Sequence, residues 1–202
     1  MEPFSLSSAA LLVVDAQRGF SPLCPAELPV PDALSIVEPI NRLLDLRWCR
    51  VDATQDWHPP DHRSFLGRKD NLYPPHCVMG SPGAEFLPGL RSERFHAIWR
   101  KGFDPDFEAY AVTAQHPAFA QVLLASGVKL VFVCGLARNI CVFYSARDLR
   151  LAGLDVCIVD DASAGIDVPQ AGLLQEKARA EALHLGIRYV FTADVLAAAR
   201  SD

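Results

Sequence analysis

The chain has 202 residues, 50% of them hydrophobic, and a formal net charge of -5 at pH 7. That length and hydrophobic fraction suit a single core, so we expect one domain over residues 1–202. The charges form no basic stripe of the kind that binds nucleic acid, and no apolar run is long enough to span a membrane.

In chain order, the apolar periodicity predicts a strand at 9–14, a helix at 33–47, strands at 50–54 and 96–100, a helix at 115–126, a strand at 130–134, a helix at 139–152, a strand at 156–159, a helix at 169–185 and a strand at 188–191. This βαβ alternation predicts a three-layer, Rossmann-like α/β fold. Its sheet is mostly parallel and carries helices on both faces.

The region at about 55–95 breaks the alternation and is rich in Pro, Gly, His and Asp. Loops longer than about 12–15 residues are uncommon in compact domains and are usually functional or disordered. The aromatic residues Trp57, Phe65, Tyr73 and Phe86 indicate an ordered loop that packs over something.

The cysteines and the N-terminus indicate the compartment. Six cysteines are too few in a chain of this length to indicate a disulfide scaffold. The run at 9–14 is too short for the core of a signal peptide, and Glu2 stands where positive charge is typical. We therefore expect a cytoplasmic protein whose cysteines are mostly buried thiols.

Two reactive side chains follow predicted strands of the sheet. Asp15 comes directly after the strand at 9–14, and Lys101 follows the strand at 96–100. Open α/β sheets bind ligands at the carboxyl ends of their strands. Taken alone, Asp15 is better explained as the cap of a turn and Lys101 as a solvated surface residue. With a cysteine at the same edge, they would supply a base and a charge partner for a nucleophile.

Cys141 is the candidate nucleophile. The strand at 130–134 leads through a glycine turn to a helix for which Asn139 is a candidate N-cap. Cys141 would then lie in the first helical turn. There the exposed N–H groups and the helix dipole favour a thiolate and can stabilise an oxyanion. A packed, unreactive cysteine explains this stretch equally well.

The long loop carries candidate metal ligands. In extended chain Asp56 and His58 point to the same side, because alternate residues do. His62 and His76 are further candidates, and Cys77 is either a soft ligand or a buried thiol. Mixed imidazole and carboxylate ligands are typical of zinc, iron or manganese, and not of calcium. Alternatively, these histidines only cap and cross-link the loop.

These motifs occur along the chain as LLVVDAQRGF, TQDWHPPDHRSF, YPPHCVMGSPGAEF, KGFD and CGLARNICVFYSARD. The combination covers nearly the whole chain and resembles the nicotinamidase branch of the isochorismatase-like cysteine hydrolases. The resemblance implies a six-stranded parallel sheet flanked by helices. It also implies an enzyme that hydrolyses nicotinamide to nicotinate and ammonia through a thioester.

The resemblance implies a role for each candidate catalytic residue. Cys141 matches the nucleophile, Asp15 the general base and Lys101 the third catalytic residue. A cis peptide bond is expected before Ala137, so that the backbone N–H groups of Ala137 and Cys141 form an oxyanion hole.

The resemblance also implies one divalent metal ion that binds the pyridine nitrogen of the substrate. Zinc is the expected ion, with Fe²⁺ and Mn²⁺ as alternatives. The residues that match metal ligands are Asp56, His58 and His76, with His62 at a position that ligates in some relatives only. The residues that match substrate-lining positions are Phe20, Tyr73 and Ala137.

Two departures from the family pattern concern the substrate. Nicotinamidases usually have Thr-Asp at the turn that reads Ala137-Arg138 here, and Tyr73 replaces a common tryptophan. Two alternatives therefore stay open, hydrolysis of another small amide or carbamoyl compound and a catalytically silent metal-binding scaffold. The Asp-x-His pair favours the pyridine amide, because carbamoyl-directed branches generally lack it. The expected partner is a small-molecule amide, and a homo-oligomer is compatible with the sequence.

Overall fold

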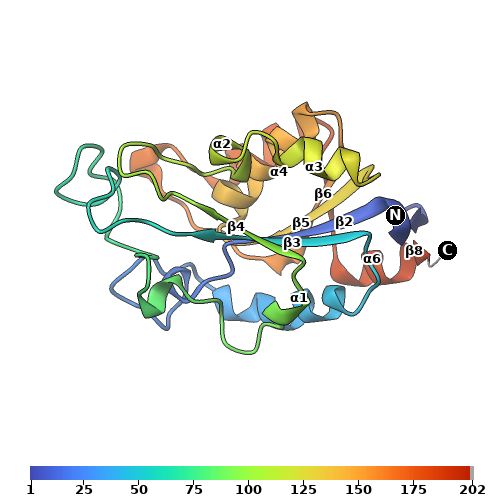
Figure 1. Ribbon diagram of the computed structural model, residues 1–202, viewed down its shortest axis with the longest axis horizontal. Helices are drawn as coiled ribbons and strands as arrows, with labels where there is room; N and C mark the ends of the chain where they lie inside the picture. Colours follow the sequence, from blue (N-terminus) through green and yellow to red (C-terminus); the bar gives the residue numbers. More distant parts are fainter. Residues whose placement is uncertain (201–202) are drawn as a thin grey trace.

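The computed structural model describes residues 1–200 and contains one six-stranded parallel sheet (Figure 1). Its strands are β2 (Ala9–Val14), β3 (Arg50–Asp56), β4 (Ala97–Lys101), β5 (Leu130–Gly135), β6 (Asp155–Ser163) and β7 (Arg188–Val190). Their order is β4-β3-β2-β5-β6-β7, and every neighbouring pair is parallel. The predicted fold class is therefore confirmed. A second, two-stranded sheet pairs β1 (Phe4–Ser5) with β8 (Ala199–Arg200).

The strand order contains a switch point between β2 and β5. From β2 the chain moves outward to β3 and β4, and it then returns to place β5 on the other side of β2. In doubly wound sheets this point opens a crevice at the carboxyl ends of the strands, where ligands bind. The site should therefore lie beyond Val14 and Gly135, which are register partners at the ends of β2 and β5.

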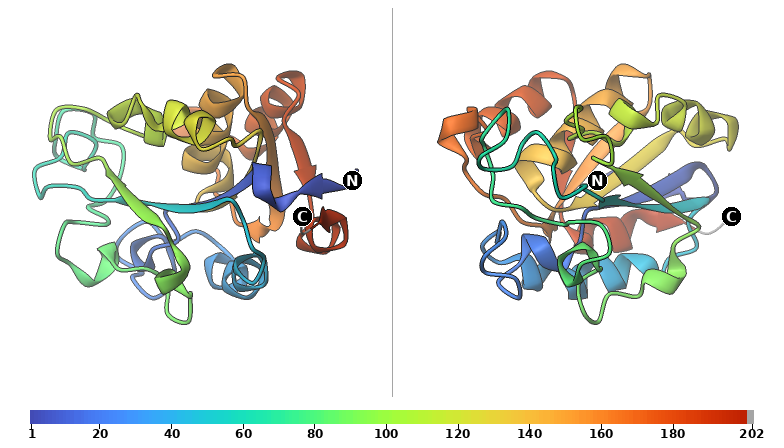
Figure 2. Two further views of the ribbon diagram at one scale, coloured as in Figure 1. Left: turned by 45° about the vertical axis from the view of Figure 1, so that its right-hand side comes forward. Right: turned by 60° about the vertical axis from the view of Figure 1, so that its left-hand side comes forward.

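Helices cover both faces of the sheet (Figure 2). They are α1 (Val37–Leu44), α2 (Val112–Gln115), α3 (Phe119–Ala125), α4 (Phe143–Leu151), α5 (Gln175–His184) and α6 (Thr192–Ala198). In Figure 1, α1 and α6 lie below the sheet, and α2, α3 and α4 lie above it. All six positions of β2 are buried between these layers, which explains its continuous apolar sequence. None of the helices within residues 1–200 has the length and apolarity needed to cross a membrane.

Three predicted helices are shorter or interrupted. The helix predicted at 33–47 starts with a 3₁₀ turn at Ala33–Ile36 and ends at Leu44. Of the helix predicted at 115–126, α3 forms only from Phe119 to Ala125, while Gln115 ends the separate short helix α2, because Pro117 disfavours helical geometry at the residue before it. In the segment predicted as one helix at 169–185, a 3₁₀ turn ends at Gly172, whose φ of 71° is left-handed, and α5 begins at Gln175.

The region at 55–95 is ordered, as its aromatic residues indicated. Its first two residues extend β3, and 3₁₀ turns form at Pro82–Ala84 and Ser92–Arg94. Phe65 and Tyr73 are 1% and 3% exposed. Both rings pack against His76, with ring centroids 5.4 and 5.7 Å from that imidazole. The loop therefore encloses the candidate metal ligands.

Candidate active site

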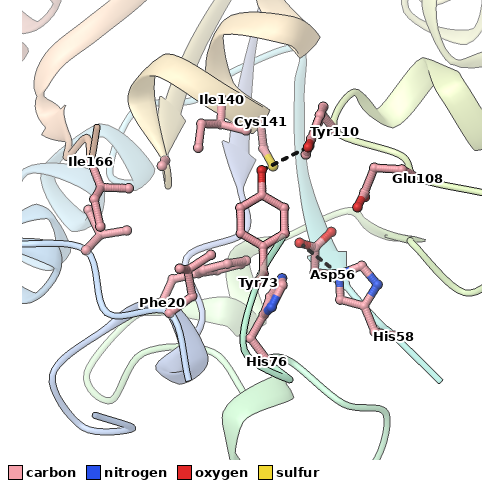
Figure 3. Close-up of a pocket in the computed structure, with 13 residues that line it drawn as sticks. Phe20, Asp56, His58, Tyr73, His76, Glu108, Tyr110, Ile140, Cys141 and Ile166 are labelled. Carbon is pink, nitrogen blue, oxygen red and sulfur yellow. Dashed lines mark hydrogen bonds and ion pairs between the residues drawn. The ribbon is translucent and has the colours of Figure 1, made fainter. Parts of the chain in front are cut away.

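The carboxyl ends of four strands bring four reactive side chains together at the switch point, and Figure 3 shows two of them, Asp56 and Cys141. Asp15 directly follows β2, Asp56 ends β3 and Lys101 ends β4. Cys141 lies in the turn of helix that follows β5. One carboxylate oxygen each of Asp15 and Asp56 and the Cys141 sulfur lie within 4.8 Å of one another. Residues that are far apart in the chain therefore form one compact cluster.

Lys101 lies at the centre of this cluster and is fully buried. Its Nζ lies 2.8 Å from Asp15 Oδ2 and 3.5 Å from Cys141 Sγ, and it also donates to Asp56 Oδ1. Burial disfavours its charge, but the carboxylates of Asp15 and Asp56 raise its pKa well above the ordinary value. Lys101 is therefore an ammonium shared between two carboxylates, and not the solvated surface lysine of the alternative interpretation.

Asp15 is held in place from two sides. The Thr54 hydroxyl donates to its Oδ1 at 2.6 Å, while Lys101 pairs with Oδ2. The backbone of Asp15 has a φ of 45°, a conformation that non-glycine residues adopt infrequently. Burial raises its pKa to about 6, against the opposing effect of Lys101. This carboxylate is consequently a stronger base than an ordinary aspartate.

Cys141 lies within a single π-helical turn, Arg138–Val142, that precedes α4. Such turns are rare and occur frequently at functional sites. Asn139 is not an N-cap, because it lies inside this turn, where its side-chain amide donates to the carbonyl groups of Ile166 and Leu173. Its role is to tie a neighbouring loop to the turn that carries the cysteine.

The protonation state of Cys141 also differs from the prediction. The residue is 5% exposed, and burial raises the pKa of its thiol well above the ordinary value, although Lys101 opposes this effect. The resting sulfur is a thiol and not a thiolate stabilised by the helix dipole. A reaction at this sulfur therefore requires a base, and Asp15 is the base that lies beside it.

The turn between β5 and Cys141 brings the backbone close to β2. A Cβ on Gly135, whose φ is 119°, would overlap the Val14 carbonyl, so only glycine fits there. The Leu136–Ala137 peptide bond is cis, as the resemblance implied. Ala137 and Cys141 both line the pocket at this point.

Asp56, His58 and His76 form a buried cluster beside the cysteine, with one potential ligand atom of each within 4.8 Å of the others. The Nδ1 atoms of His58 and His76 lie 2.9 and 2.8 Å from the carbonyl oxygens of Gly102 and Pro74. A carbonyl only accepts, so each Nδ1 carries a proton and each Nε2 is left to face the cluster. His58 Nε2 lies 3.5 Å from Asp56 Oδ2, and against the effect of burial this carboxylate raises the pKa of His58. Burial lowers the pKa of His76 to about 3, so this ring is neutral. These donors fit one divalent cation.

His62 and Cys77 lie near this cluster but outside it. The His62 ring is 4.2 Å from that of His58, centroid to centroid. Its two nitrogens are in hydrogen bonds with the Ser64 hydroxyl at 2.8 Å and the Phe107 carbonyl at 3.2 Å. The thiol of Cys77 is fully buried and donates to the Gly83 carbonyl at 3.6 Å. Both side chains thus support the loop.

The pocket above Cys141 is lined by all three residues that matched substrate-lining positions, Phe20, Tyr73 and Ala137. The sequence did not indicate the other residues of its wall, which are Leu28, Val30, Glu108, Tyr110, Ile140 and Ile166. The Tyr73 and Tyr110 hydroxyls are 2.9 Å apart and form a hydrogen bond in the pocket wall (Figure 3). Glu108 and Tyr110 follow Lys101 by fewer than ten residues, so their nearness to a candidate catalytic residue could have indicated them. No sequence feature distinguishes the apolar wall residues from the core.

A buried cysteine, carboxylate and ammonium at the switch point of a parallel α/β sheet define a cysteine hydrolase site. The family model described as the Isochorismatase domain matches residues 9–186. The chain therefore belongs to the isochorismatase family.

Several proteins similar to this chain are nicotinamidases or pyrazinamidases by name. A nicotinamidase of Acinetobacter baylyi is 32% identical over 210 residues, covering 94% of this chain and 95% of the relative. The structure of PnC1 from L. infantum in complex with nicotinate has a TM-score of 0.87 at 30% identity and covers 99% of this chain and 98% of its own. Pyrococcus horikoshii pyrazinamidase in complex with zinc has a TM-score of 0.79 at 36% identity and covers 91% and 99%.

Proposed function

We propose that this protein is a metal-dependent cysteine amidohydrolase that converts nicotinamide and water into nicotinate and ammonia. The observation that carries the proposal is that Cys141 and the cluster of Asp56, His58 and His76 line one pocket. A nucleophile beside a metal site suits a carboxamide attached to a ring with a metal-binding nitrogen. The names of the relatives support the same substrate class.

The first half of the proposed reaction forms a thioester. Asp15 accepts the thiol proton of Cys141, and the thiolate attacks the carboxamide carbon. The resulting oxyanion accepts hydrogen bonds from the backbone N–H groups of Ala137 and Cys141. Lys101 keeps Asp15 oriented and offsets negative charge in the cluster. The carbon–nitrogen bond then breaks, and Asp15 returns the proton to the departing ammonia.

The second half releases the acid. Asp15, again a carboxylate, deprotonates a water molecule, and the hydroxide attacks the thioester carbon. The carbon–sulfur bond breaks, nicotinate leaves, and Asp15 passes the proton back to the Cys141 thiolate. The raised pKa of Asp15, about 6, suits a group that accepts and returns a proton near neutral pH.

We propose that Asp56, His58 and His76 hold one divalent metal ion, with zinc as the first choice. Three protein ligands of nitrogen and oxygen type with open positions are typical of catalytic zinc, and iron or manganese fit the same donors. When bound, the ion would supply a Lewis acid that positions the heteroaromatic ring. Because both ring nitrogens of His62 bind other groups, His62 is not part of the proposed set.

The pocket walls suit a flat ring. Phe20 lies against His76, with ring centroids 5.3 Å apart, and Tyr73 stands edge-on to the same imidazole at 5.7 Å. We propose that the substrate ring lies among these aromatic groups, with its carboxamide toward Cys141 and its ring nitrogen toward the metal site. This orientation would hold the reacting carbon beside the sulfur.

We also propose that residues 1–202 act as one domain in the cytosol. Support for one domain comes from a single core cluster that includes residues from Leu6 to Val195. Support for a reducing compartment comes from the cysteines, all six of which are free thiols.

Ammonia release from nicotinamide by purified, metal-defined protein tests the proposed function. We expect turnover that a chelator suppresses and added Zn²⁺ restores, with pyrazinamide as a second substrate. Turnover of a carbamoyl compound that a chelator does not affect would support the alternative amidohydrolase. If the metal-loaded protein hydrolyses none of a panel of small amides and carbamoyl compounds, only the catalytically silent scaffold remains.

A further inference from the structure

The carboxylate of Glu27 connects three loops around the candidate metal site. Glu27 belongs to the segment that follows β2, and its Oε2 accepts a hydrogen bond of 2.8 Å from the backbone N–H of Cys77. Cys77 directly follows His76, one of the three candidate ligands. The same carboxylate lies against Gly83 in the 3₁₀ turn at Pro82–Ala84. One anionic group thus contacts the backbone beside a metal ligand.

The peptide that Glu27 contacts has an unusual conformation. Cys77 has a φ of 45°, in the left-handed region that non-glycine residues adopt infrequently. Such conformations persist only where the surroundings impose them. The Cys77 carbonyl also accepts a hydrogen bond of 3.1 Å from the backbone N–H of His58. The backbone of Cys77 therefore links both candidate histidine ligands to Glu27.

Two glycines leave room for this carboxylate. A Cβ on Gly83 would overlap both Glu27 carboxylate oxygens, and a Cβ on Gly19 would overlap Oε2 and crowd the Cys77 sulfur. Neither glycine has a positive φ, so neither is required for backbone conformation. Both positions instead require the absence of a side chain. The two glycines therefore leave a space beside the backbone that the Glu27 carboxylate fills.

The segment that carries Glu27 also forms one wall of the substrate pocket. Phe20, Leu28 and Val30 line the pocket. Backbone hydrogen bonds from Leu28 to Gly19 and from Val30 to Phe20, both 3.1 Å, hold this segment together. The Phe20 ring contacts His76 directly, as Figure 3 shows. Glu27 consequently fixes the ring wall and the ligand loop against each other.

We infer that Glu27 is a positioning residue for the metal site, which holds His76 and His58 in ligating geometry through the backbone of Cys77. The inference rests on the proposed function, because it assigns Glu27 a purpose only if these histidines bind a metal ion. Glu27 is absent from the lining of the pocket and from the Cys141 cluster. Its loss should therefore alter metal affinity and substrate affinity more than the chemical step.

Metal affinity is the decisive measurement. Apo forms of the wild type, Glu27→Ala, Glu27→Gln and Gly83→Ala are titrated with Zn²⁺ against a chromogenic chelator, and their Co²⁺ adducts are examined by visible absorption. Removing a group that orients ligands commonly costs about 10–100-fold in metal affinity. We expect a loss of this size and an altered Co²⁺ spectrum for Glu27→Ala. Glu27→Gln, which still has an oxygen acceptor for the Cys77 N–H, should recover most of the affinity.

Gly83→Ala provides an independent test, because it displaces the carboxylate without removing it. The overlapping atoms belong to the flexible end of Glu27, so the fold can accommodate the methyl group. We expect the same weakening of metal binding as for Glu27→Ala. With saturating Zn²⁺, both variants should show a raised KM for nicotinamide and a kcat close to that of the wild type. If Glu27→Ala fails to fold, Gly83→Ala decides the question.

Glu85→Ala is the matched control, since Glu85 is an exposed acid in the neighbouring turn, paired with Arg18 at 3.4 Å. It should bind Zn²⁺ as the wild type does. Wild-type Zn²⁺ affinity and an unchanged Co²⁺ spectrum in folded Glu27→Ala or Gly83→Ala would overturn the inference. Failure of the wild type to bind Zn²⁺ would instead contradict the metal site of the proposed function.

Discussion

Lys101 and Asp15 form an ion pair that is fully shielded from solvent, with Nζ 2.8 Å from Oδ2. Removing one partner of a buried pair leaves the other charge uncompensated, which costs about 3–5 kcal/mol. We expect Lys101→Met to reduce the free energy of unfolding in urea by an amount of this order and to abolish turnover. Lys129→Met, at an exposed lysine, should change the free energy of unfolding by less than about 0.5 kcal/mol. Equal stability of the two variants would refute the structural importance of the pair.

The loss of the sulfur should separate chemistry from metal binding. Cys141→Ala should lower the rate of ammonia release by about 10³-fold or more, as removal of a nucleophile does in other hydrolases. Its metal content should stay at the wild-type level, because the sulfur is not part of the Asp56, His58 and His76 cluster. Ammonia assays and elemental analysis check both results. Cys24→Ala, at a partly exposed thiol, is the control and should keep wild-type turnover. Wild-type turnover by Cys141→Ala would exclude Cys141 as the nucleophile.

The metal ligands should affect substrate affinity. His58→Ala should lose most of its bound metal and raise the KM for nicotinamide, because the ring nitrogen of the substrate loses its anchor. Elemental analysis and steady-state kinetics measure these effects. His184→Ala, at an exposed histidine, should change neither. Full metal occupancy in His58→Ala would remove His58 from the proposed ligands.

Gly102 should be necessary for the orientation of His58. A Cβ on Gly102, whose φ is 69°, would overlap the His58 imidazole, and the Gly102 carbonyl accepts its Nδ1 proton. We expect Gly102→Ala to weaken Zn²⁺ binding by about 10–100-fold, measured by chelator competition. Gly127→Ala imposes similar backbone strain at a φ of 81° but meets no atom within 4 Å. It should destabilise the protein without changing metal affinity, and equal affinities for the two variants would contradict the prediction.

The hydrogen bond between the Tyr73 and Tyr110 hydroxyls should contribute to pocket stability. Tyr73→Phe and Tyr110→Phe should each reduce the free energy of unfolding by about 1 kcal/mol, as is typical of a lost hydrogen bond. The double variant should cost less than the sum of the two, because either substitution already breaks the bond. Strictly additive losses in urea unfolding would show that the two hydroxyls do not interact.

Much of the architecture could be predicted because local patterns decide it. The apolar run at 9–14 became β2 at the predicted bounds, and the runs at 130–134 and 188–191 became strands within one residue of them. Buried parallel strands read as continuous apolar runs, so their positions are visible in the sequence. Helix bounds were less accurate. Pro117 and Gly172 interrupt two predicted helices, although both residues are visible in the sequence.

Residue types and their positions after predicted strands made Asp15, Lys101 and Cys141 candidates, and the resemblance assigned a role to each. The six-stranded parallel sheet followed from the resemblance, but the order of its strands, and therefore the switch point, came only from the structure. The protonation of the Cys141 sulfur was not predictable either, because it depends on burial and on the charges that surround it, which come from separate strands. The role of Asn139 likewise depended on a loop more than twenty residues further along the chain, at Ile166.

The sequence by itself determined the parallel α/β fold and the chemical groups of the site, because strand periodicity and residue type are local properties. Only the tertiary structure decided which of those groups share a proton, an ion pair or a ligand position. Such contacts depend on distances of a few ångströms between separate segments. The contact of Glu27 with the peptide that follows His76 is one of them, and no spacing along the chain indicates it.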